Sequence, residues 1–216
     1  NNAASVIDVT SAPTGLTSDG KPYAERYTTY NATLTPASGN YMLPESVTVT
    51  ADGTALTAGT DYTYDPATGE LTIHADKVTG ALNITADGLQ IKYELSVDSG
   101  DPTTPDELDF GTVDYGAPVS ARTVTLKNTG NQPLTVDRPE FALTSDFEME
   151  LGSAFDVNGQ AALAPGEIAT FTVRPASGLL LGDHSDFIDI STNNRNASGS
   201  LSVGIAIQEA VVNLAD

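Results

Sequence analysis

Three adjacent residues, His184, Ser185 and Asp186, come nearest in this chain to the side chains of a hydrolase. A Ser–His–Asp triad works because the fold brings hydroxyl, imidazole and carboxylate into one hydrogen-bonded row. Neighbours on an extended chain point to opposite sides, so these three side chains should diverge. The other histidine, His74, is expected on the solvent face of its strand. The sequence therefore predicts no catalytic residues and no enzyme.

Carboxylates gather near the middle of the chain, at Asp98, Asp101, Asp106, Glu107 and Asp109. Calcium takes six to eight oxygen ligands, and a cluster of this kind can supply some of them. The spacing matches no calcium-loop motif, and no DxDxDG run is present. We expect a solvated acidic linker, with calcium binding as the alternative, and therefore no metal or other cofactor.

Tyrosines are concentrated in the first half of the chain, at Tyr23, Tyr27, Tyr30, Tyr41, Tyr62, Tyr64 and Tyr93. Exposed aromatic rings can cover the apolar face of a sugar. However, Tyr62 and Tyr64 share a strand face opposite Leu71 and Ile73, which favours packing in a core. Carbohydrate binding stays an alternative.

A lysine–asparagine isopeptide crosslink would need a buried lysine beside an asparagine and a carboxylate. Lys92 and Lys127 lie on expected strands, but each alternates with inward apolar residues. Both should therefore face solvent. The sequence predicts no crosslink at these positions.

The elements that carry these residues follow a two-residue period. Apolar side chains alternate with polar ones in TVTLKN (123–128), ATFTVR (169–174), ELTIHA (70–75) and SLSVGIAI (200–207). This alternation is typical of a strand with one buried and one solvated face. No stretch of similar length has the 3.6-residue period of a helix. The sequence predicts an all-β protein.

The composition narrows the function further. The 216 residues include 29 acidic and 9 basic side chains, for a formal charge of −20, and no cysteine. Such a surface disfavours nucleic acid and anionic membranes and favours a soluble monomer. A cysteine-free sandwich is more typical of a bacterial than of a eukaryotic extracellular protein. We expect a bacterial cell-surface or secreted protein.

The sequence contains no signal peptide and no apolar run long enough to insert into a membrane. Its first residue is Asn1 rather than Met. We therefore expect this chain to be a piece of a longer polypeptide.

A stretch rich in Gly, Pro and acidic residues, VDSGDPTTPDELDF (97–110), interrupts the apolar periodicity. Gly and Pro both weaken strands, so a linker is expected there. The predicted domains are 1–97 and 108–216, joined by a linker at 98–107. Each is expected to be an immunoglobulin-like β-sandwich, because several short strands are separated by turn signals.

In the first domain, strands are expected at 5–10, 26–35, 46–51, 54–57, 61–65, 70–75, 81–86 and 90–97. Asp52-Gly53 predicts a two-residue hairpin turn of type I′. The inner face should include Val47, Val49, Leu71, Ile73, Leu82, Ile84, Ile91, Tyr93, Leu95 and Val97. In the second domain, it should include Val124, Leu126, Leu134, Val136, Ala169, Phe171, Val173, Ile188, Ile190, Leu201, Val203, Ile205 and Ile207.

Two resemblances cover most of the chain. The phrases NATLTPASGNYMLPESVTVTADGTALTAGTDYTYDPATGELTI and KVTGALNITADG, within 31–88, resemble a repeat module of large Gram-positive surface proteins. LDFGTVDYGAPVSARTVTLKNTGNQPLTV (108–136) and LAPGEIATFTVRPASGLLLGDHSDFIDIST (163–192) resemble immunoglobulin-like domains of the abnormal-spindle/hydin type, which extend to about 207 here. This second pattern usually has an aromatic residue where this chain has His184. Both resemblances imply rigid, non-catalytic modules.

The function expected from the sequence is structural: two spacer modules of an adhesin-type stalk. The alternative is a binding module for a surface carbohydrate or a host protein, with an exposed loop or edge strand making the contact. An exposed apolar or aromatic patch would favour the binding module.

Overall fold

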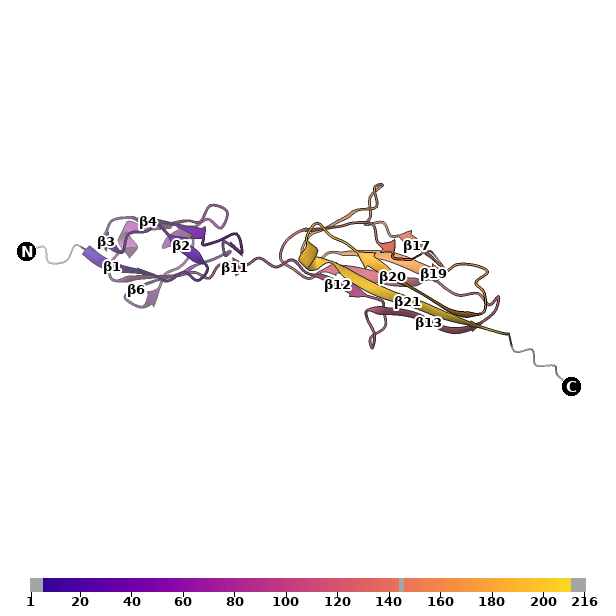
Figure 1. Cartoon of the computed structure of the whole chain (residues 1–216). Helices are drawn as coiled ribbons and strands as arrows, with labels where there is room; N and C mark the ends of the chain where they lie inside the picture. The colour runs from indigo at the N-terminus through magenta and orange to yellow at the C-terminus, as the bar shows by residue number, and fades with distance from the viewer. Residues whose placement is uncertain (1–5, 144–145, 211–216) are drawn as a thin grey trace, which may run out of the picture. The chain divides into compact units, whose positions relative to one another are not determined.

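The computed structural model describes residues 6–143 and 146–210 of the chain. It divides into two compact units, Asn1–Ile91 (unit 1) and Lys92–Asp216 (unit 2). Strands dominate both units (Figure 1). The helical elements among the described residues are two 3₁₀ turns, η1 (Ala75–Lys77) and η2 (Arg195–Ala197). The predicted all-β class is confirmed.

Unit 1 is a sandwich of two main sheets with a small third pair. The first sheet has the order β3 (Tyr23–Glu25), β1 (Val6–Ser11), β10 (Leu82–Thr85), β6 (Thr48–Ala51) and β7 (Thr54–Ala55). The second has the order β2 (Leu16–Ser18), β4 (Tyr30–Pro36), β9 (Glu70–Ile73) and β8 (Tyr62–Tyr64). The pair consists of β11 (Leu89–Gln90) and β5 (Tyr41–Met42).

Alternation along these strands directs one row of side chains into the core of unit 1. The aliphatic positions predicted there and found buried are Val47, Val49, Leu71, Ile73, Leu82 and Ile84. Fully burying an aliphatic side chain contributes roughly 1.5–3 kcal/mol, so these rows hold the sheets together.

The hairpin between β6 and β7 has the predicted two-residue turn. Ala51 pairs with Thr54, which leaves Asp52 and Gly53 as the two turn residues. Both have positive φ, 47° and 79° respectively, as a type I′ turn requires.

Unit 2 is a second sandwich with its own core. One sheet has the order β12 (Leu95–Asp98), β14 (Arg122–Asn128), β19 (Ile168–Pro175) and β17 (Phe147–Leu151). The other has the order β13 (Glu107–Asp114), β21 (Gly199–Gln208), β20 (Gly182–Ile190) and β16 (Glu140–Phe141). β15 (Leu134–Val136) pairs with β18 (Ala161–Leu163).

The core positions predicted for this unit lie inside it. All the named aliphatic and aromatic residues from Val124 to Ile205 are buried, and Ile207 is partly buried against them. Both units are immunoglobulin-like β-sandwiches.

The predicted boundary between the domains is wrong by several residues. β12, which was assigned to the first domain, pairs antiparallel with β14 of unit 2, with Leu95 opposite Asn128 and Val97 opposite Leu126. Leu95 and Val97 pack against the core of unit 2. Tyr93, predicted to face inward, is 37% exposed.

The expected linker 98–107 is a folded turn within unit 2. The Ser99 N–H donates to the Pro105 carbonyl, and the Ser99 hydroxyl donates to the Thr104 carbonyl. Ser99 is buried. Gly and Pro are common in turns inside a domain as well as in linkers between domains. The composition of this stretch therefore led to a predicted domain boundary that lies C-terminal to the observed one.

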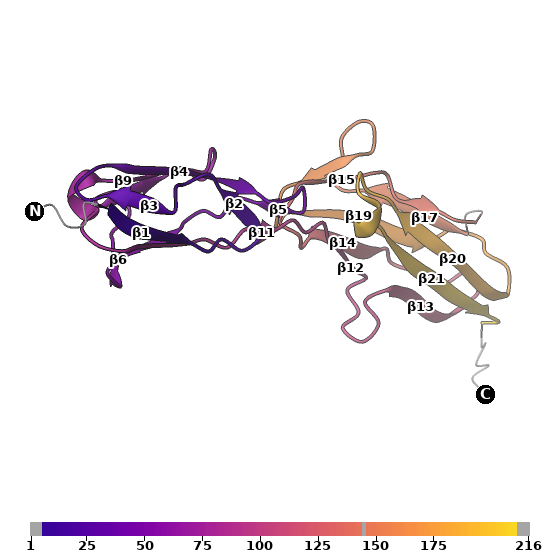
Figure 2. The ribbon, with the colours of Figure 1, turned by 60° about the vertical axis from the view of Figure 1, so that its left-hand side comes forward.

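The first long strand of each unit runs parallel to a strand near the end of that unit. β1 pairs parallel with β10, and β13 pairs parallel with β21. Two neighbouring strands that run parallel start at the same end of a sheet and finish at its opposite end. Within unit 1, β1 begins at the end opposite β11, and within unit 2, β12 lies opposite the end of β21 (Figures 1 and 2). The chain therefore enters each sandwich at one end and leaves it at the other.

Candidate functional site

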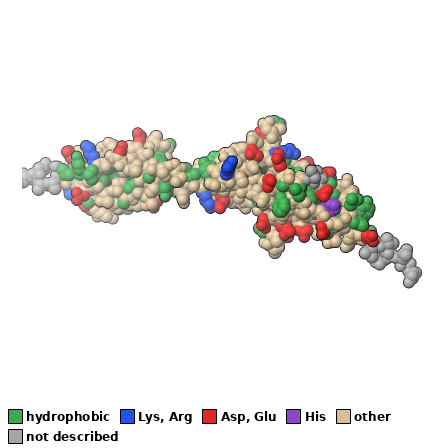
Figure 3. Space-filling view, viewed as in Figure 1, with side chains coloured by type: hydrophobic (Ala, Val, Ile, Leu, Met, Phe, Trp, Pro, Cys, Tyr) green, Lys and Arg blue, Asp and Glu red, His purple; other side chains and the backbone are tan. Residues whose placement is uncertain are grey.

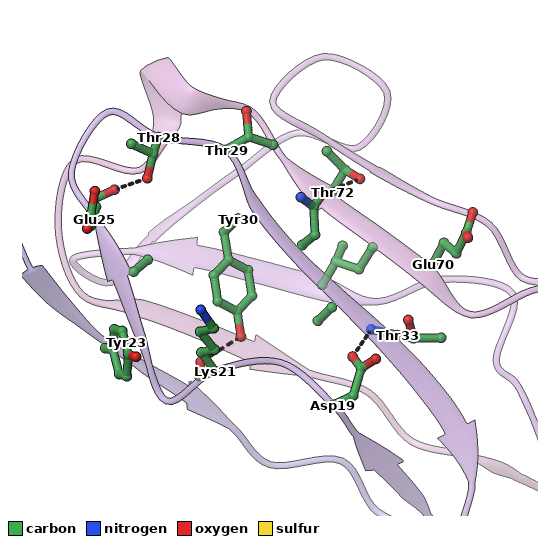
Figure 4. A pocket seen from close by; sticks show the side chains of 14 residues that line it. Asp19, Lys21, Tyr23, Glu25, Thr28, Thr29, Tyr30, Thr33, Glu70 and Thr72 are labelled. Carbon is green, nitrogen blue, oxygen red and sulfur yellow. Dashed lines mark hydrogen bonds between the residues drawn. The ribbon is translucent and has the colours of Figure 1, made fainter.

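Unit 1 contains a groove of about 670 Å³ between β3 and β4 (Figure 4). These two strands belong to different sheets and are not hydrogen-bonded to each other. The segment from Asp19 to Pro22 crosses from one sheet to the other at this side of the sandwich. The groove is thus the open flank of the sandwich between two strand edges.

The floor of the groove is the margin of the core. It is lined by four buried residues, Ala24, Tyr30, Ala32 and Leu71. The Tyr30 hydroxyl donates to the Lys21 carbonyl at 2.8 Å and so ties β4 to the crossing segment. Burial raises the pKa of the Tyr30 phenol, and the nearby Asp19 carboxylate raises it further. Tyr30 is therefore a neutral, structural residue at physiological pH.

The rim of the groove carries hydroxyl and carboxylate groups. Asp19 Oδ1 accepts from the Thr33 N–H at 2.5 Å, and the Thr28 hydroxyl donates to the Glu25 carbonyl at 2.6 Å. Figure 4 shows these contacts on either side of Tyr30, with Glu70 on the neighbouring strand β9. Such groups suit a ligand that is recognised by hydrogen bonds and charge.

One cation, Lys21, stands among the acidic side chains of this groove. Its ammonium lies 5.9 Å from the centre of the Tyr23 ring, a cation–π distance. Asp19, Glu25 and Glu70 leave the groove with a net negative charge.

The residues of the hypothetical triad do not assemble. On β20, Ser185 is exposed and Asp186 is 2% exposed, so the two side chains point to opposite faces. The partner of His184 is instead Asp146, whose Oδ2 lies 2.7 Å from His184 Nδ1. His184 Nε2 lies 2.8 Å from the Leu180 carbonyl oxygen.

Both nitrogens of His184 thus face hydrogen-bond acceptors, and only the imidazolium can donate from both. The Leu180 carbonyl and the Asp146 carboxylate raise the pKa of His184. Sequence reasoning could not identify this pair, because 38 positions separate the two residues and only the fold joins them.

Three of the five carboxylates in the acidic cluster at 98–109 accept hydrogen bonds within their own turns. Asp98 Oδ1 accepts from the Gly100 N–H and Asp109 Oδ1 from the Gly111 N–H. Asp101 Oδ1 accepts from both the hydroxyl and the N–H of Thr103, and these bonds lower the pKa of Asp101. Such side-chain-to-backbone bonds are the usual reason for Asp in turns. Within the described residues, no three His, Cys, Asp or Glu side chains are placed to hold a metal ion.

The remaining candidates lie as follows. Tyr62 is buried and its hydroxyl donates to the Val47 carbonyl, so it packs in the core as the sequence favoured. His74 was expected to face solvent but is half-buried, directly after β9. Lys92 and Lys127 are exposed.

The surface of both units is otherwise mixed. In Figure 3, acidic side chains are spread over unit 2 and basic ones are few. Figure 3 shows hydrophobic side chains gathered at one end of unit 2. The exposed large hydrophobic residues of this unit include Tyr115, Leu180 and Leu181. The described residues include no helix with the length and apolar character needed to cross a bilayer.

Comparisons with known proteins give only distant structural likenesses. No protein-family model and no curated protein matches the chain. Among solved structures, it is similar to the YadV chaperone, with 10% identity over 54% of this chain and 52% of that one and a TM-score of 0.36. The periplasmic chaperone SfaE gives 8% identity over 55% and 59%, with a TM-score of 0.37.

A protein of unknown function from Porphyromonas gingivalis W83 is similar over more of the chain. The match covers 89% of this chain and 99% of that one, at 9% identity and a TM-score of 0.40. The chain spans little more than half the length of the two chaperones. At such identities and TM-scores, these likenesses say nothing about function.

Proposed function

We propose that the chain is a pair of non-catalytic spacer modules in a secreted or cell-wall-attached bacterial surface protein. The observation that carries this proposal is the path of the chain, which enters each sandwich at one end and leaves it at the other. Modules with this path can be joined in series, and each adds its length to a stalk.

The parallel pairing also suits a module that bears tension. Pulling on the two ends of unit 1 draws β1 and β10 along each other, so several inter-strand hydrogen bonds are loaded together rather than one by one. The chain that follows β1 extends this pairing, since the Ala12 and Thr14 N–H groups donate to the Ile84 and Ala86 carbonyls.

The composition supports a location outside the cell. The chain has no cysteine to be oxidised, and its charge of −20 keeps neighbouring copies apart in solution. On the rim of the groove, the Asp19 carboxylate and the Thr28 hydroxyl are engaged in structural hydrogen bonds, which fits a module without catalysis.

Single-molecule stretching of the full chain, held by its two ends, tests this function. We expect two discrete unfolding events per chain, one from each sandwich, because each has its own core. Thr10 lies on the same side of β1 as Ala12 and Thr14, so Thr10→Pro removes a donor from the loaded pairing. It should lower the unfolding force of unit 1 only.

Thr10→Ala is the matched control, since it keeps the N–H on an exposed position. It should unfold at the wild-type force. Smooth extension at low force, or equal forces for Thr10→Pro and wild type, would contradict the spacer proposal.

A further inference from the structure

We propose that the groove between β3 and β4 binds an extended, basic peptide segment, which adds to unit 1 as a further β-strand. This goes beyond the spacer function and does not depend on it. The proposal rests on backbone groups at two strand edges, on the room between them and on the charge around them.

The edge of β4 leaves one residue open toward the groove. The Leu34 N–H donates to the Gly69 carbonyl next to β9, and bonding direction alternates along an antiparallel strand. Tyr30 and Ala32 therefore bond toward β9, whereas Asn31 and Thr33 point the other way.

Both backbone groups of Thr33 have partners on Asp19. The Asp19 N–H donates to the Thr33 carbonyl, and the Thr33 N–H donates to Asp19 Oδ1. The backbone N–H and C=O of Asn31 have no partner among the described residues.

The edge of β3 faces the same groove with a second open residue. The Val9 N–H donates to the Pro22 carbonyl, so Pro22 bonds toward β1. Bonding direction alternates along β3, so the next residue whose backbone groups point toward β1 is Ala24. Tyr23 then directs its backbone groups away from β1, and within the described chain they have no partner either. Tyr23 is 48% exposed. An added strand can thus find backbone partners on either wall.

The groove is open rather than filled by the chain's own side chains. It holds about 670 Å³ above the buried Tyr30 ring. Asn31 is exposed, and its side-chain oxygen accepts from the Thr72 hydroxyl at 2.9 Å, which holds the amide over β9. Proteins commonly protect strand edges with a lysine, a proline or a bulge. The open edge of β4 at Asn31 has none of these.

The charge of the rim selects the class of peptide. Asp19, Glu25 and Glu70 outnumber Lys21, and the whole chain carries −20. Residues alternate in direction along an added strand, so every second side chain of a bound peptide would reach the acidic rim. A segment with lysine or arginine at alternate positions meets both requirements.

The test uses the full chain and a capped peptide of alternating lysine and threonine, eight residues long. The acidic analogue with glutamate in place of lysine is the control ligand. We expect the basic peptide to bind, to shift the amide signals of Asn31 and Tyr23, and to slow the exchange of the Asn31 amide hydrogen at least tenfold. The acidic analogue should not bind.

Two variants separate strand addition from simple charge attraction. Asn31→Pro removes the open N–H without touching the ladder to β9, and it should weaken binding at least tenfold. Asn31→Ala keeps the N–H and should bind within about twofold of wild type. Melting temperatures show whether both variants are folded. If Asn31→Pro does not fold, the test rests on the wild-type chain, where bound peptide should slow exchange of the Asn31 amide hydrogen.

Several outcomes would overturn the proposal. These are no binding at millimolar peptide, equal binding by Asn31→Pro, or binding that leaves the Asn31 amide unprotected. A neutral chitin oligosaccharide that shifts these amides when the basic peptide does not would instead identify a sugar site. The stretching experiment on the spacer function is unaffected by any of these results.

Discussion

At the scale of single residues, the pair His184–Asp146 makes the stability of unit 2 depend on pH. The folded state raises the pKa of His184, because the imidazolium donates to both the Leu180 carbonyl and the Asp146 carboxylate. This stabilisation is fully present below the unfolded pKa of about 6.5 and is lost as pH rises through the higher folded value.

His184→Gln should therefore destabilise unit 2 by about 1 kcal/mol at pH 5.5 and by less at pH 9, in line with the usual net worth of a hydrogen bond. Urea unfolding at the two pH values, followed through amide signals of unit 2, measures the difference. The control is His74→Gln, which changes a residue of unit 1 and should leave this pH dependence intact. An equal loss at both pH values would mean that the imidazole acts through packing alone.

Residue-level chemistry was predictable from the sequence only where it is local. The divergence of Ser185 from Asp186 follows from strand alternation. The partner of His184 does not, because no local rule links positions 146 and 184. Asn128 is a similar case: it ends the predicted strand 123–128, but the alternation of that strand does not indicate the carbonyls of Gln132 and Leu163, to which its fully buried amide donates.

At the scale of elements, the hairpin between β6 and β7 depends on Gly53. Its φ of 79° is a conformation that L side chains reach only with strain. Gly53→Val should destabilise unit 1 by about 1–2 kcal/mol, because a β-branched residue adds strain in this region.

Chemical denaturation of unit 1 measures this loss. Gly39→Ala is the control, since Gly39 lies in open space without a positive φ, and it should change stability by less than about 0.5 kcal/mol. If both substitutions cost the same, the turn conformation would not be what limits this hairpin.

The sequence predicted strand faces better than strand edges. Alternation identified the buried rows of the long strands, such as Leu71 and Ile73 on β9. It also predicted one strand over 26–35, whereas Tyr27 has a φ of 58° and β4 begins only at Tyr30. This break separates β3 from β4, the two strands that line the groove. Periodicity shows which side chains are buried but not which backbone edges remain unpaired, so the groove was not foreseeable.

At the scale of the whole molecule, the position of the boundary between the two units decides which pieces of the chain fold. Two separate cores were predictable, because two sets of alternating strands flank an interruption. The assignment of β12 was not, because Leu95 and Val97 have the same alternation whichever core they join.

A pair of fragments tests this boundary. Residues 92–216 should fold as an independent sandwich, whereas residues 98–216 lack all of β12 except Asp98. Without it, β14 loses a neighbour and the apolar contacts of Leu95 and Val97 disappear from the core. The loss should be at least about 3 kcal/mol, from roughly 1–2 kcal/mol for each partly buried side chain and the inter-strand hydrogen bonds.

Thermal unfolding of the two fragments provides the measurement, and the complementary fragments 1–91 and 1–97 provide the control. Fragment 1–97 should melt at the same temperature as 1–91, because residues 92–97 contribute nothing to the core of unit 1. If 98–216 were as stable as 92–216 while 1–97 exceeded 1–91, β12 would belong to the first sandwich in solution. The greater stability of 92–216 would instead place the start of the second module at the strand that pairs with β14.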